Sequence, residues 1–153
     1  MAIYFYKEFG ELGYLASYSP HGFMKDGVYW KTIEHYYQAQ KFYDKEVQQL
    51  IIEAETPKQA SAIGRNRIYK LREDWEQVKN EIMYEAVLEK FLQHPNLAEK
   101  LMETGNEEII EDTKKENYWG CGPNRDGLNV YGKILCKVRE ELKIQRQKGG
   151  CVE

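Results

Sequence analysis

Cysteine and histidine are scarce in this sequence, and neither is spaced for a metal site. The chain has three cysteines and three histidines in 153 residues. No C-x-x-C or H-E-x-x-H spacing joins them, so they form no recognisable zinc-binding pattern. The residues concerned are Cys121, Cys136, Cys151, His21, His35 and His94. We therefore expect no metal ion and no other cofactor.

The chain also lacks the features of a secreted or membrane protein. Residues 1–6 show no signal-peptide pattern, and an odd number of scattered cysteines is typical of a reducing compartment. No stretch approaches the roughly 18 apolar residues that a membrane-spanning helix requires. These absences predict a cytoplasmic protein that has no membrane partner.

Positive charge is not in excess, and the common nucleotide and hydrolase motifs are missing. The formal net charge is −3 and the pI is about 5.7, which argues against nonspecific nucleic-acid binding. If such a chain acts on nucleic acid, it recognises a base or a sugar locally. The absence of a Walker loop, a G-x-S-x-G motif and a G-x-G-x-x-G motif disfavours nucleoside triphosphatases, hydrolase triads and Rossmann dehydrogenases.

The composition that remains is that of an ordinary globular domain. Hydrophobic residues make up 42% of the chain and charged residues 31%, which is far from the composition of a disordered protein. No linker, repeat or low-complexity segment divides it. We expect one domain over residues 1–144 and a flexible tail at residues 145–153.

Apolar spacing predicts a mainly helical chain with a few short strands. Helical periodicity and capping residues indicate helices at residues 33–43, 45–55, 57–64, 74–91, from 95 to about 105, and from about 127 onward. Strands are expected at residues 3–6, 27–30 and 107–111, and a loop at residues 14–23. The predicted fold class is α+β, predominantly helical, in a single domain.

The segment Glu34-His-Tyr-Tyr-Gln-Ala-Gln-Lys-Phe42 carries the most chemistry. On a helix, Glu34, Gln38 and Lys41 stand at i, i+4 and i+7 and project from one face. The surrounding aromatic residues would partly desolvate the amine and lower its pKa. A solvated polar stripe whose aromatic residues turn to the core would give the same spacing.

Two further segments are candidates for ligand contacts. Glycines flank Trp119 in Tyr-Trp-Gly-Cys-Gly at residues 118–122, where backbone could approach a flat ligand and the indole could stack on it. An ordinary turn around a buried tryptophan is the alternative. Arg65 follows a helix end in Gly64-Arg-Asn-Arg67 and could hold a phosphate, although arginines in a loop are commonly only solvated.

Taken in order, these segments resemble the NADAR family, also called YbiA-like proteins. The similarity rests on Thr-Ile-Glu-His-Tyr-Tyr-Gln-Ala-Gln-Lys-Phe at residues 32–42, Ile-Gly-Arg at 63–65, Asp-Trp at 74–75, Tyr-Trp-Gly-Cys-Gly at 118–122 and Gly-x-Asn at 127–129. It covers roughly residues 3–142. The resemblance implies a mainly helical fold of the NADAR type, with a few short strands and a pocket for a ribosyl-type ligand.

The function that this resemblance implies is N-glycosidic hydrolysis. The implied substrates are ribosylaminopyrimidine intermediates of riboflavin biosynthesis or ADP-ribosylated guanine in DNA or RNA, and the alternative is a noncatalytic module that binds ADP-ribose. In both substrates the sugar C1 is attached to an exocyclic amino group. The residues implied as catalytic are Glu34, Lys41 and Glu116. Those implied as substrate-binding are His35, Gln38, Arg65, Trp75, Lys79, Trp119, Gly120 and Asn129.

The chain departs from the family pattern at two places, and its mechanism stays open. Ala16-Ser17-Tyr18 stands where the family often has Ser-Asn-Phe, and Glu116 stands where an aspartate is usual. Lys41 could form a Schiff base with the opened sugar while Glu34 moves protons. A carboxylate that directs water onto an oxocarbenium-like C1 is the noncovalent alternative.

Overall fold

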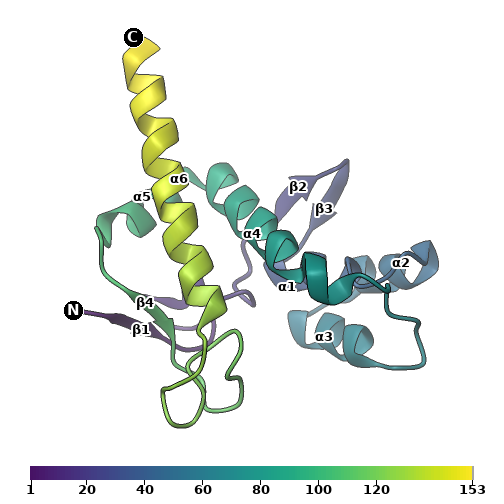
Figure 1. Ribbon diagram of the computed structural model, residues 1–153. Coiled ribbons are helices and arrows are strands. Elements are labelled where there is room, and N and C mark those ends of the chain that lie inside the picture. The colour runs from purple at the N-terminus through teal and green to yellow at the C-terminus, as the bar shows by residue number, and fades with distance from the viewer. Residues whose placement is uncertain (153) are drawn as a thin grey trace. The chain divides into compact units, whose positions relative to one another are not determined.

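The computed structural model describes the backbone of residues 1–152 and the side chains of residues 1–149. It is mostly helical and has short strands, as the sequence predicted (Figure 1). The chain forms two compact units. The first unit comprises residues 1–16 and the chain from Phe91 onward, and the second unit comprises Ser17–Lys90.

The second unit begins with a β-hairpin. Strands β2 (Phe23–Lys25) and β3 (Val28–Trp30) pair antiparallel, with Phe23 opposite Trp30. Asp26 and Gly27 connect them, both with positive φ, as a tight hairpin turn requires. The prediction missed β2 because the proline and glycine just before it indicated a loop.

Four helices follow the hairpin: α1 (Ile33–Ala39), α2 (Lys45–Glu53), α3 (Pro57–Arg65) and α4 (Trp75–Gln93). The Thr32 hydroxyl caps α1 by accepting a hydrogen bond from the His35 amide. Thr56 and Gln59 form a capping box at α3, and Pro57 occupies its first position. These helix starts are therefore local events, and the sequence predicted them correctly.

The predicted end of α1 was wrong. The helix was expected to continue to residue 43 but ends at Ala39. The amides of Lys41 and Phe42 turn back to carbonyls only three residues earlier, and the Lys41 carbonyl accepts a hydrogen bond from the Arg72 amide at 2.8 Å. A contact with a segment some thirty residues away thus overrides the helical pattern, and Lys41 lies in the turn after the helix.

The first unit is built on a parallel strand pair. Strands β1 (Ile3–Phe5) and β4 (Ile109–Glu111) lie side by side, and helices α5 (Pro95–Glu103) and α6 (Val130–Val152) complete the unit (Figure 1). A short 3₁₀ helix, η1 (Gly13–Leu15), provides the Leu15 carbonyl, to which the Tyr131 hydroxyl donates at 2.5 Å. Its buried apolar side chains include Phe5, Leu15, Phe91, Leu101, Ile109, Leu135 and Val138.

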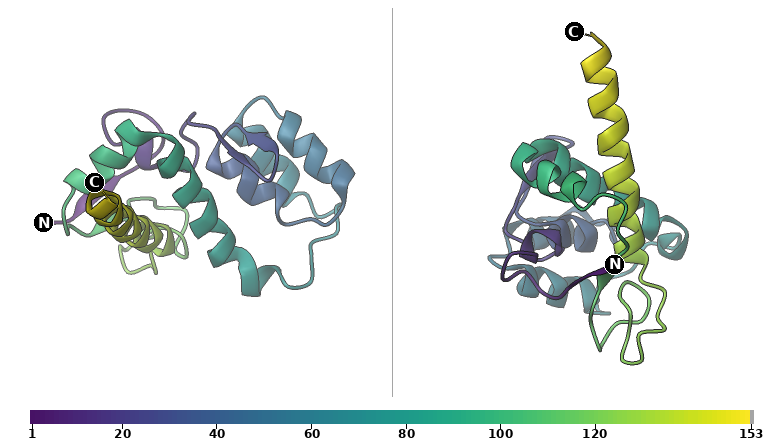
Figure 2. Two further views of the ribbon diagram at one scale, coloured as in Figure 1. Left: turned by 90° about the horizontal axis from the view of Figure 1, so that it is seen from above. Right: turned by 90° about the vertical axis from the view of Figure 1, so that its left-hand side faces the viewer.

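Helix α6 begins later and ends later than expected. The amides of Gly127 and Leu128 bond to carbonyls in the preceding loop, so the helix starts at Val130 rather than near residue 127. Figure 2 shows α6 as one continuous helix, which continues through Val152 into the predicted tail. The flexibility of residues 145–153 stays a prediction, and residue 153 lies outside the described chain.

None of the helices within residues 1–152 has the length and apolar composition needed to cross a membrane. Cys121 and Cys136 are free thiols, and the side chain of Cys151 lies outside the described residues.

Candidate active site

A buried carboxyl and a buried amide form the centre of the second unit. Glu34 and Gln38 stand one turn apart on α1, and only 8% and 3% of their surfaces are exposed. The Gln38 Nε2 donates to Glu34 Oε2 at 2.6 Å. On the other side, the Ser17 carbonyl accepts from the Glu34 amide at 3.1 Å, and the Ser17 hydroxyl lies 3.5 Å from Oε1. The carboxyl is thus held by neutral groups.

This environment favours the protonated form of Glu34. Burial raises the pKa of its carboxyl, and the hydrogen bond from Gln38 is the largest of the effects that oppose the rise. Lys41, Ser61 and Arg65 lower the pKa by smaller amounts. A carboxyl whose pKa is raised is better suited to serve as a general acid.

The Lys41 amine lies beside a pair of aromatic rings. Its Nζ is 5.5 Å from the centre of the Tyr37 ring and 6.0 Å from that of Trp75, and the two rings meet edge to face at 5.1 Å. Burial lowers the pKa of Lys41 to about 8, which the Glu34 carboxylate opposes. The positive charges that lower it further belong to Arg67, Arg65 and Lys79. Desolvation by aromatic residues was expected from the sequence, and the structure supplies it.

A second set of contacts holds the backbone that carries Lys41. Arg72 makes a two-pronged ion pair with Asp74, at 2.6 and 2.9 Å, and stacks over the Tyr43 ring. Its remaining prong bonds to the Gln40 carbonyl. The Arg72 hydrogen bond lowers the pKa of the Asp74 carboxyl to about 2. The turn after α1 is therefore fixed by the segment that precedes α4.

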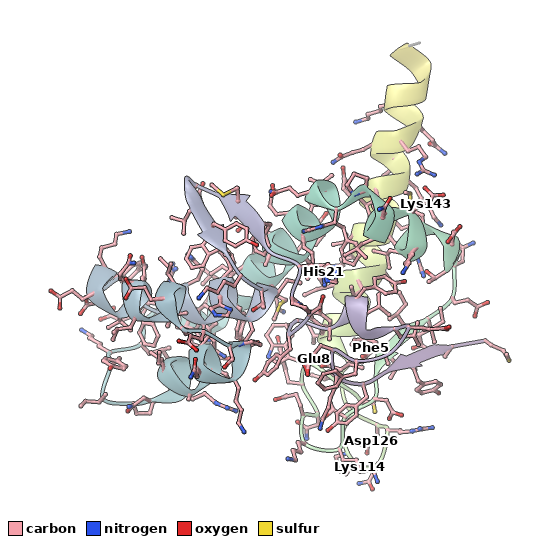
Figure 3. The ribbon with its side chains drawn as sticks, turned by 180° about the vertical axis from the view of Figure 1, so that it is seen from behind. Phe5, Glu8, His21, Lys114, Asp126 and Lys143 are labelled. Carbon is pink, nitrogen blue, oxygen red and sulfur yellow. The ribbon has the colours of Figure 1, made fainter. Side chains whose placement is uncertain are left out.

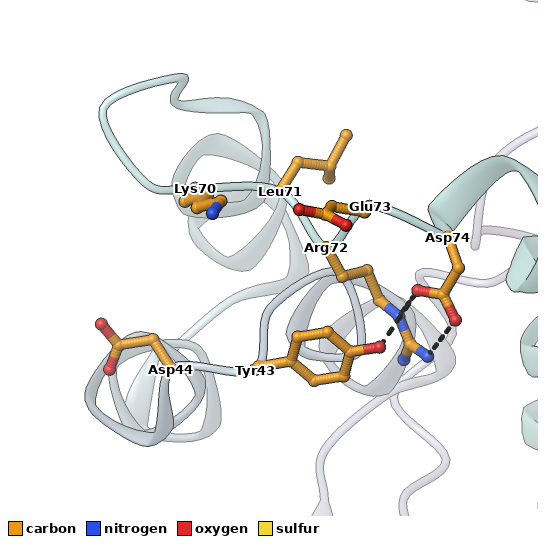
Figure 4. Close-up of a pocket in the computed structure, with 7 residues that line it drawn as sticks. All are labelled: Tyr43, Asp44, Lys70, Leu71, Arg72, Glu73 and Asp74. Carbon is orange, nitrogen blue, oxygen red and sulfur yellow. Dashed lines mark hydrogen bonds and ion pairs between the residues drawn. The ribbon is translucent and has the colours of Figure 1, made fainter.

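A cavity of about 620 Å³ opens beside this ion pair (Figure 4). It is lined by Tyr43, Asp44 and residues 70–74. None of the predicted site residues is among them, and its arginine is already occupied by Asp74. The buried Glu34 and Lys41 therefore remain the better chemical candidates, because they carry the shifted acid and base.

The His35 side chain is buried and hydrogen-bonded within the fold. It is fully buried. Its Nδ1 bonds with the Thr32 hydroxyl at 2.8 Å and its Nε2 with the Ala54 carbonyl at 3.0 Å. Burial lowers the pKa of the imidazole, so the ring is neutral and joins the start of α1 to the end of α2. Both nitrogens are thus engaged within the fold.

The other predicted residues of the second unit differ in exposure. Trp75 is buried against Tyr37. Lys79 pairs with Glu76 at 2.7 Å on the first turns of α4. Arg65 is exposed in the last turn of α3. Trp75, Lys79 and Arg65 all act on Lys41, the first through its ring and the others through their charges.

The remaining four predicted residues lie in the first unit, on the loop that follows β4, whose residues Lys114 and Asp126 are labelled in Figure 3. Glu116 Oε1 accepts hydrogen bonds from the amides of Tyr118 and Trp119, at 2.8 and 3.3 Å. Trp119 is only partly buried and meets Tyr118 edge to face. The Glu116 carboxylate therefore shapes the turn that presents the indole.

Asn129 and Gly120 join this loop to β4. The Asn129 amide donates to the Ile109 carbonyl at 2.9 Å and accepts from the Glu111 amide at 3.0 Å. A Cβ at Gly120 would collide with the Thr113 methyl and lie 2.8 Å from the Glu111 carbonyl. Asn129 is thus occupied by backbone, and Gly120 is required for packing. The ligand roles of Asn129 and Gly120 stay predictions.

Three residues near this centre were not predicted from the sequence: Ser17 and Ser61, which act on Glu34, and Gly64, which lies against Gln38. Ser61 and Gly64 are buried and stand three positions apart on α3. Small residues at that spacing indicate close approach of a neighbouring helix, so this signal was available in the sequence. Among the side chains that the structure describes, no three His, Cys, Asp or Glu residues are grouped so as to hold a metal ion.

Comparison with known proteins assigns this arrangement to a family. The NADAR domain matches residues 4–143, which include all the predicted catalytic and substrate-binding residues. The chain belongs to the NADAR family. The N-glycosidase Npun_R5314 of Nostoc punctiforme is 48% identical to this NADAR chain over 146 residues, which cover 94% of each protein.

Two other relatives extend the comparison. The NMR structure of the Escherichia coli protein YbiA has a TM-score of 0.89 and 36% identity to this NADAR chain, covering 95% of it and 87% of YbiA. The riboflavin biosynthesis protein VVA0006 of Vibrio vulnificus is 41% identical over 141 residues, which cover 92% of this chain but 38% of that protein. The fold expected from the sequence is therefore confirmed.

Proposed function

We propose that this protein is an N-glycosidase that hydrolyses the bond between the C1 of a ribosyl or ADP-ribosyl group and an exocyclic amino nitrogen. The observation that carries the proposal is the buried Glu34 carboxyl followed, seven residues later, by the desolvated Lys41 amine. Relatives named as N-glycosidases, similar over nearly the whole chain, support it. A module that only binds a nucleotide has no use for such a pair.

Glu34 supplies the first proton. A glycosylamine opens when its ring oxygen leaves C1 and takes up a proton, while the amino nitrogen forms a double bond to C1. The raised pKa of Glu34 keeps that proton available at a higher pH than an ordinary carboxyl would. The resulting carboxylate stabilises the positive charge of the iminium.

Lys41 then exchanges with the aglycone. Its neutral amine adds to C1, the proton that it loses passes to the aglycone nitrogen, and the aglycone departs as a free amine. This leaves an imine between C1 and Lys41 Nζ. Water adds to that carbon, the Lys41 amine departs, and the released aldehyde closes to the free sugar. The pKa of about 8 makes a useful fraction of Lys41 neutral at physiological pH.

Both substrate classes present this glycosylamine, and the relatives favour one of them. Similar proteins from Vibrio vulnificus and Zea mays are named riboflavin biosynthesis proteins. A ribosylaminopyrimidine is therefore the first substrate to test, and ADP-ribosylated guanine in DNA or RNA is the second. Arg65 and Lys79 of the second unit provide positive charge for a phosphate.

Direct assay of both substrate classes tests the proposal. The purified protein is incubated with a ribosylaminopyrimidine phosphate and, separately, with ADP-ribosylated DNA, and the released sugar is measured. We expect turnover of at least one, and its loss in Lys41→Arg, which keeps the charge but cannot form an imine. Tight binding of both ligands without release of sugar would instead identify a noncatalytic binding module.

Borohydride distinguishes the two chemical routes. Added during turnover, it should reduce the imine and leave a sugar adduct on the peptide that contains Lys41, which mass spectrometry detects. Sustained turnover of Lys41→Arg, with no adduct in the parent, would mean that water attacks C1 directly under the control of Glu34.

A further inference from the structure

Helix α3 places small side chains against the two buried polar groups of α1. Ser61 and Gly64 are buried, and neither is among the catalytic or substrate-binding residues that the family resemblance implies. The Ser61 hydroxyl lowers the pKa of the Glu34 carboxyl, which places it close to that group. A Cβ at Gly64 would collide with the Gln38 Oε1 and lie 2.7 Å from its Cδ. The Gln38 amide therefore occupies the space that a side chain at residue 64 would fill.

The Gln38 amide is held in this space at a cost. Its Oε1 is buried and has no hydrogen-bond partner in the structure, whereas its Nε2 bonds to Glu34 at 2.6 Å. If the amide were rotated by 180°, the nitrogen would face Gly64 instead and be equally unpaired. A buried polar atom without a partner is unfavourable, so the fold keeps this amide for its contact with Glu34.

We propose that α3 is the positioning element of the Glu34 carboxyl: Gly64 leaves the space from which Gln38 reaches it, and the buried Ser61 lies one turn earlier on the same helix. The inference rests on the proposed function for its catalytic meaning, but the positioning itself can be observed without substrate. Ser61 and Gly64 are positioning residues, because they act through Glu34 and Gln38.

The arrangement sets how strongly Glu34 holds its proton. Burial raises the pKa of this carboxyl, while the hydrogen bond from Gln38 and the Ser61 hydroxyl lower it. Two charged groups act on Glu34: Lys41, in the turn that follows α1, and Arg65, in the last turn of α3. Loss of the Gln38 hydrogen bond or of the Ser61 hydroxyl leaves those two charges in place and must therefore move the pKa upward.

The test is a carboxyl titration followed by ¹³C NMR, with Glu34 assigned by the loss of its signal in Glu34→Gln. We expect Gly64→Ala and Ser61→Ala each to move the Glu34 midpoint upward by about one pH unit, a tenfold change in proton affinity. Where turnover is measurable, the Glu34-dependent limb of the kcat/KM profile should move in the same direction.

A double-mutant cycle shows whether Gly64 acts through Gln38. Gln38→Ala should itself raise the midpoint, and adding Gly64→Ala in that background should change it no further, since the amide that the new methyl group would displace is then absent. Should Gly64→Ala alone fail to fold, that background removes its two shortest contacts, with Oε1 and Cδ of Gln38, and leaves only the Gln38 Cβ at 2.9 Å. The matched control is Ala62→Gly, an exposed position on α3, which should leave the midpoint unchanged.

Three results would overturn the inference. They are an unchanged Glu34 midpoint in both Ser61→Ala and Gly64→Ala, an equal displacement in Ala62→Gly, or an undiminished effect of Gly64→Ala when Gln38 is absent. A displaced midpoint in a protein that turns over neither substrate class would support the positioning role and reject the proposed function, so the two failures are distinguishable.

Discussion

The two regions that carry the family motifs treat their polar side chains in opposite ways. Around α1, burial disfavours the charged forms of Glu34 and Lys41, because it raises the pKa of the carboxyl and lowers the pKa of the amine. The Oε1 atom of the neighbouring Gln38 amide has no hydrogen-bond partner. In the loop after β4, the oxygens of Glu116 and Asn129 accept hydrogen bonds from backbone amides.

This difference separates groups that are poised from groups that hold structure. A polar group satisfied by the backbone stabilises a loop and changes little during a reaction. A buried ionisable group whose pKa is shifted stores free energy that can be used when its proton moves. We infer that α1 and the turn after it provide the reacting groups, Glu34 and Lys41, and that the loop after β4 holds Trp119 in place.

The largest expected effect comes from replacing the carboxylates of the two regions, Glu34 and Glu116, one at a time. Glu34→Gln should lower turnover by about 10²- to 10⁴-fold, because the general acid is lost. Glu116→Gln keeps an oxygen that can accept from the Tyr118 and Trp119 amides, so its turnover should fall by less than about tenfold. Steady-state assays of both variants decide the matter, and an equal loss in Glu116→Gln would show that this carboxylate also takes part in catalysis.

The titration of Lys41 sharpens the same contrast. With a pKa of about 8, its amine should be neutral about 300 times more often at pH 7 than a lysine with the ordinary value of 10.5. The Lys41 Cε signal, assigned by its absence in Lys41→Arg, should show a midpoint near 8 in a ¹³C NMR titration. A midpoint close to 10.5 would remove the basis for nucleophilic attack.

Asn129 tests the structural side of the comparison. Asn129→Ala leaves the Ile109 carbonyl and the Glu111 amide without their partner, and should lower the free energy of unfolding by about 1–3 kcal/mol. Thermal or urea unfolding measures this. At low temperature the titration of Lys41 should be unchanged. A variant of parental stability that binds substrate poorly would instead assign Asn129 to the ligand.

Replacing Lys41 by a similar apolar side chain should stabilise the protein while inactivating it. In Lys41→Met the cost of burying a charged amine disappears, and the free energy of unfolding at pH 7 should rise by about 1–2 kcal/mol. The gain should be full below pH 8, shrink between pH 8 and 10.5, and vanish above that, because the parent amine is then neutral in both states. Urea unfolding at pH 7 and at pH 11 checks it, and a destabilised variant would mean that Lys41 is mainly a packing residue.

Local chemistry determined much of this protein. Thr32 and Thr56 begin helices through contacts within the next three residues, and the period of the apolar residues located α4 within two residues. The motif at residues 34–42 and its resemblance to the NADAR family pointed to Glu34 and Lys41. The helix starts and the position of α4 depend on neighbours in the chain, so the order of residues was enough to predict them, whereas the catalytic roles of Glu34 and Lys41 stay predictions.

Tertiary structure decided where the helix ends and which groups hold the carboxyl. Helix α1 stops at Ala39 because Arg72 bonds to the turn that follows, and no local pattern announces that contact. Ser17 and Ser61 reach Glu34 only when α1 lies against their segments. Asn129 could be recognised as part of a motif, but its bonds to β4 join residues some twenty positions apart. Burial and pairing between distant segments are properties of the packed chain, and therefore only the tertiary structure revealed them.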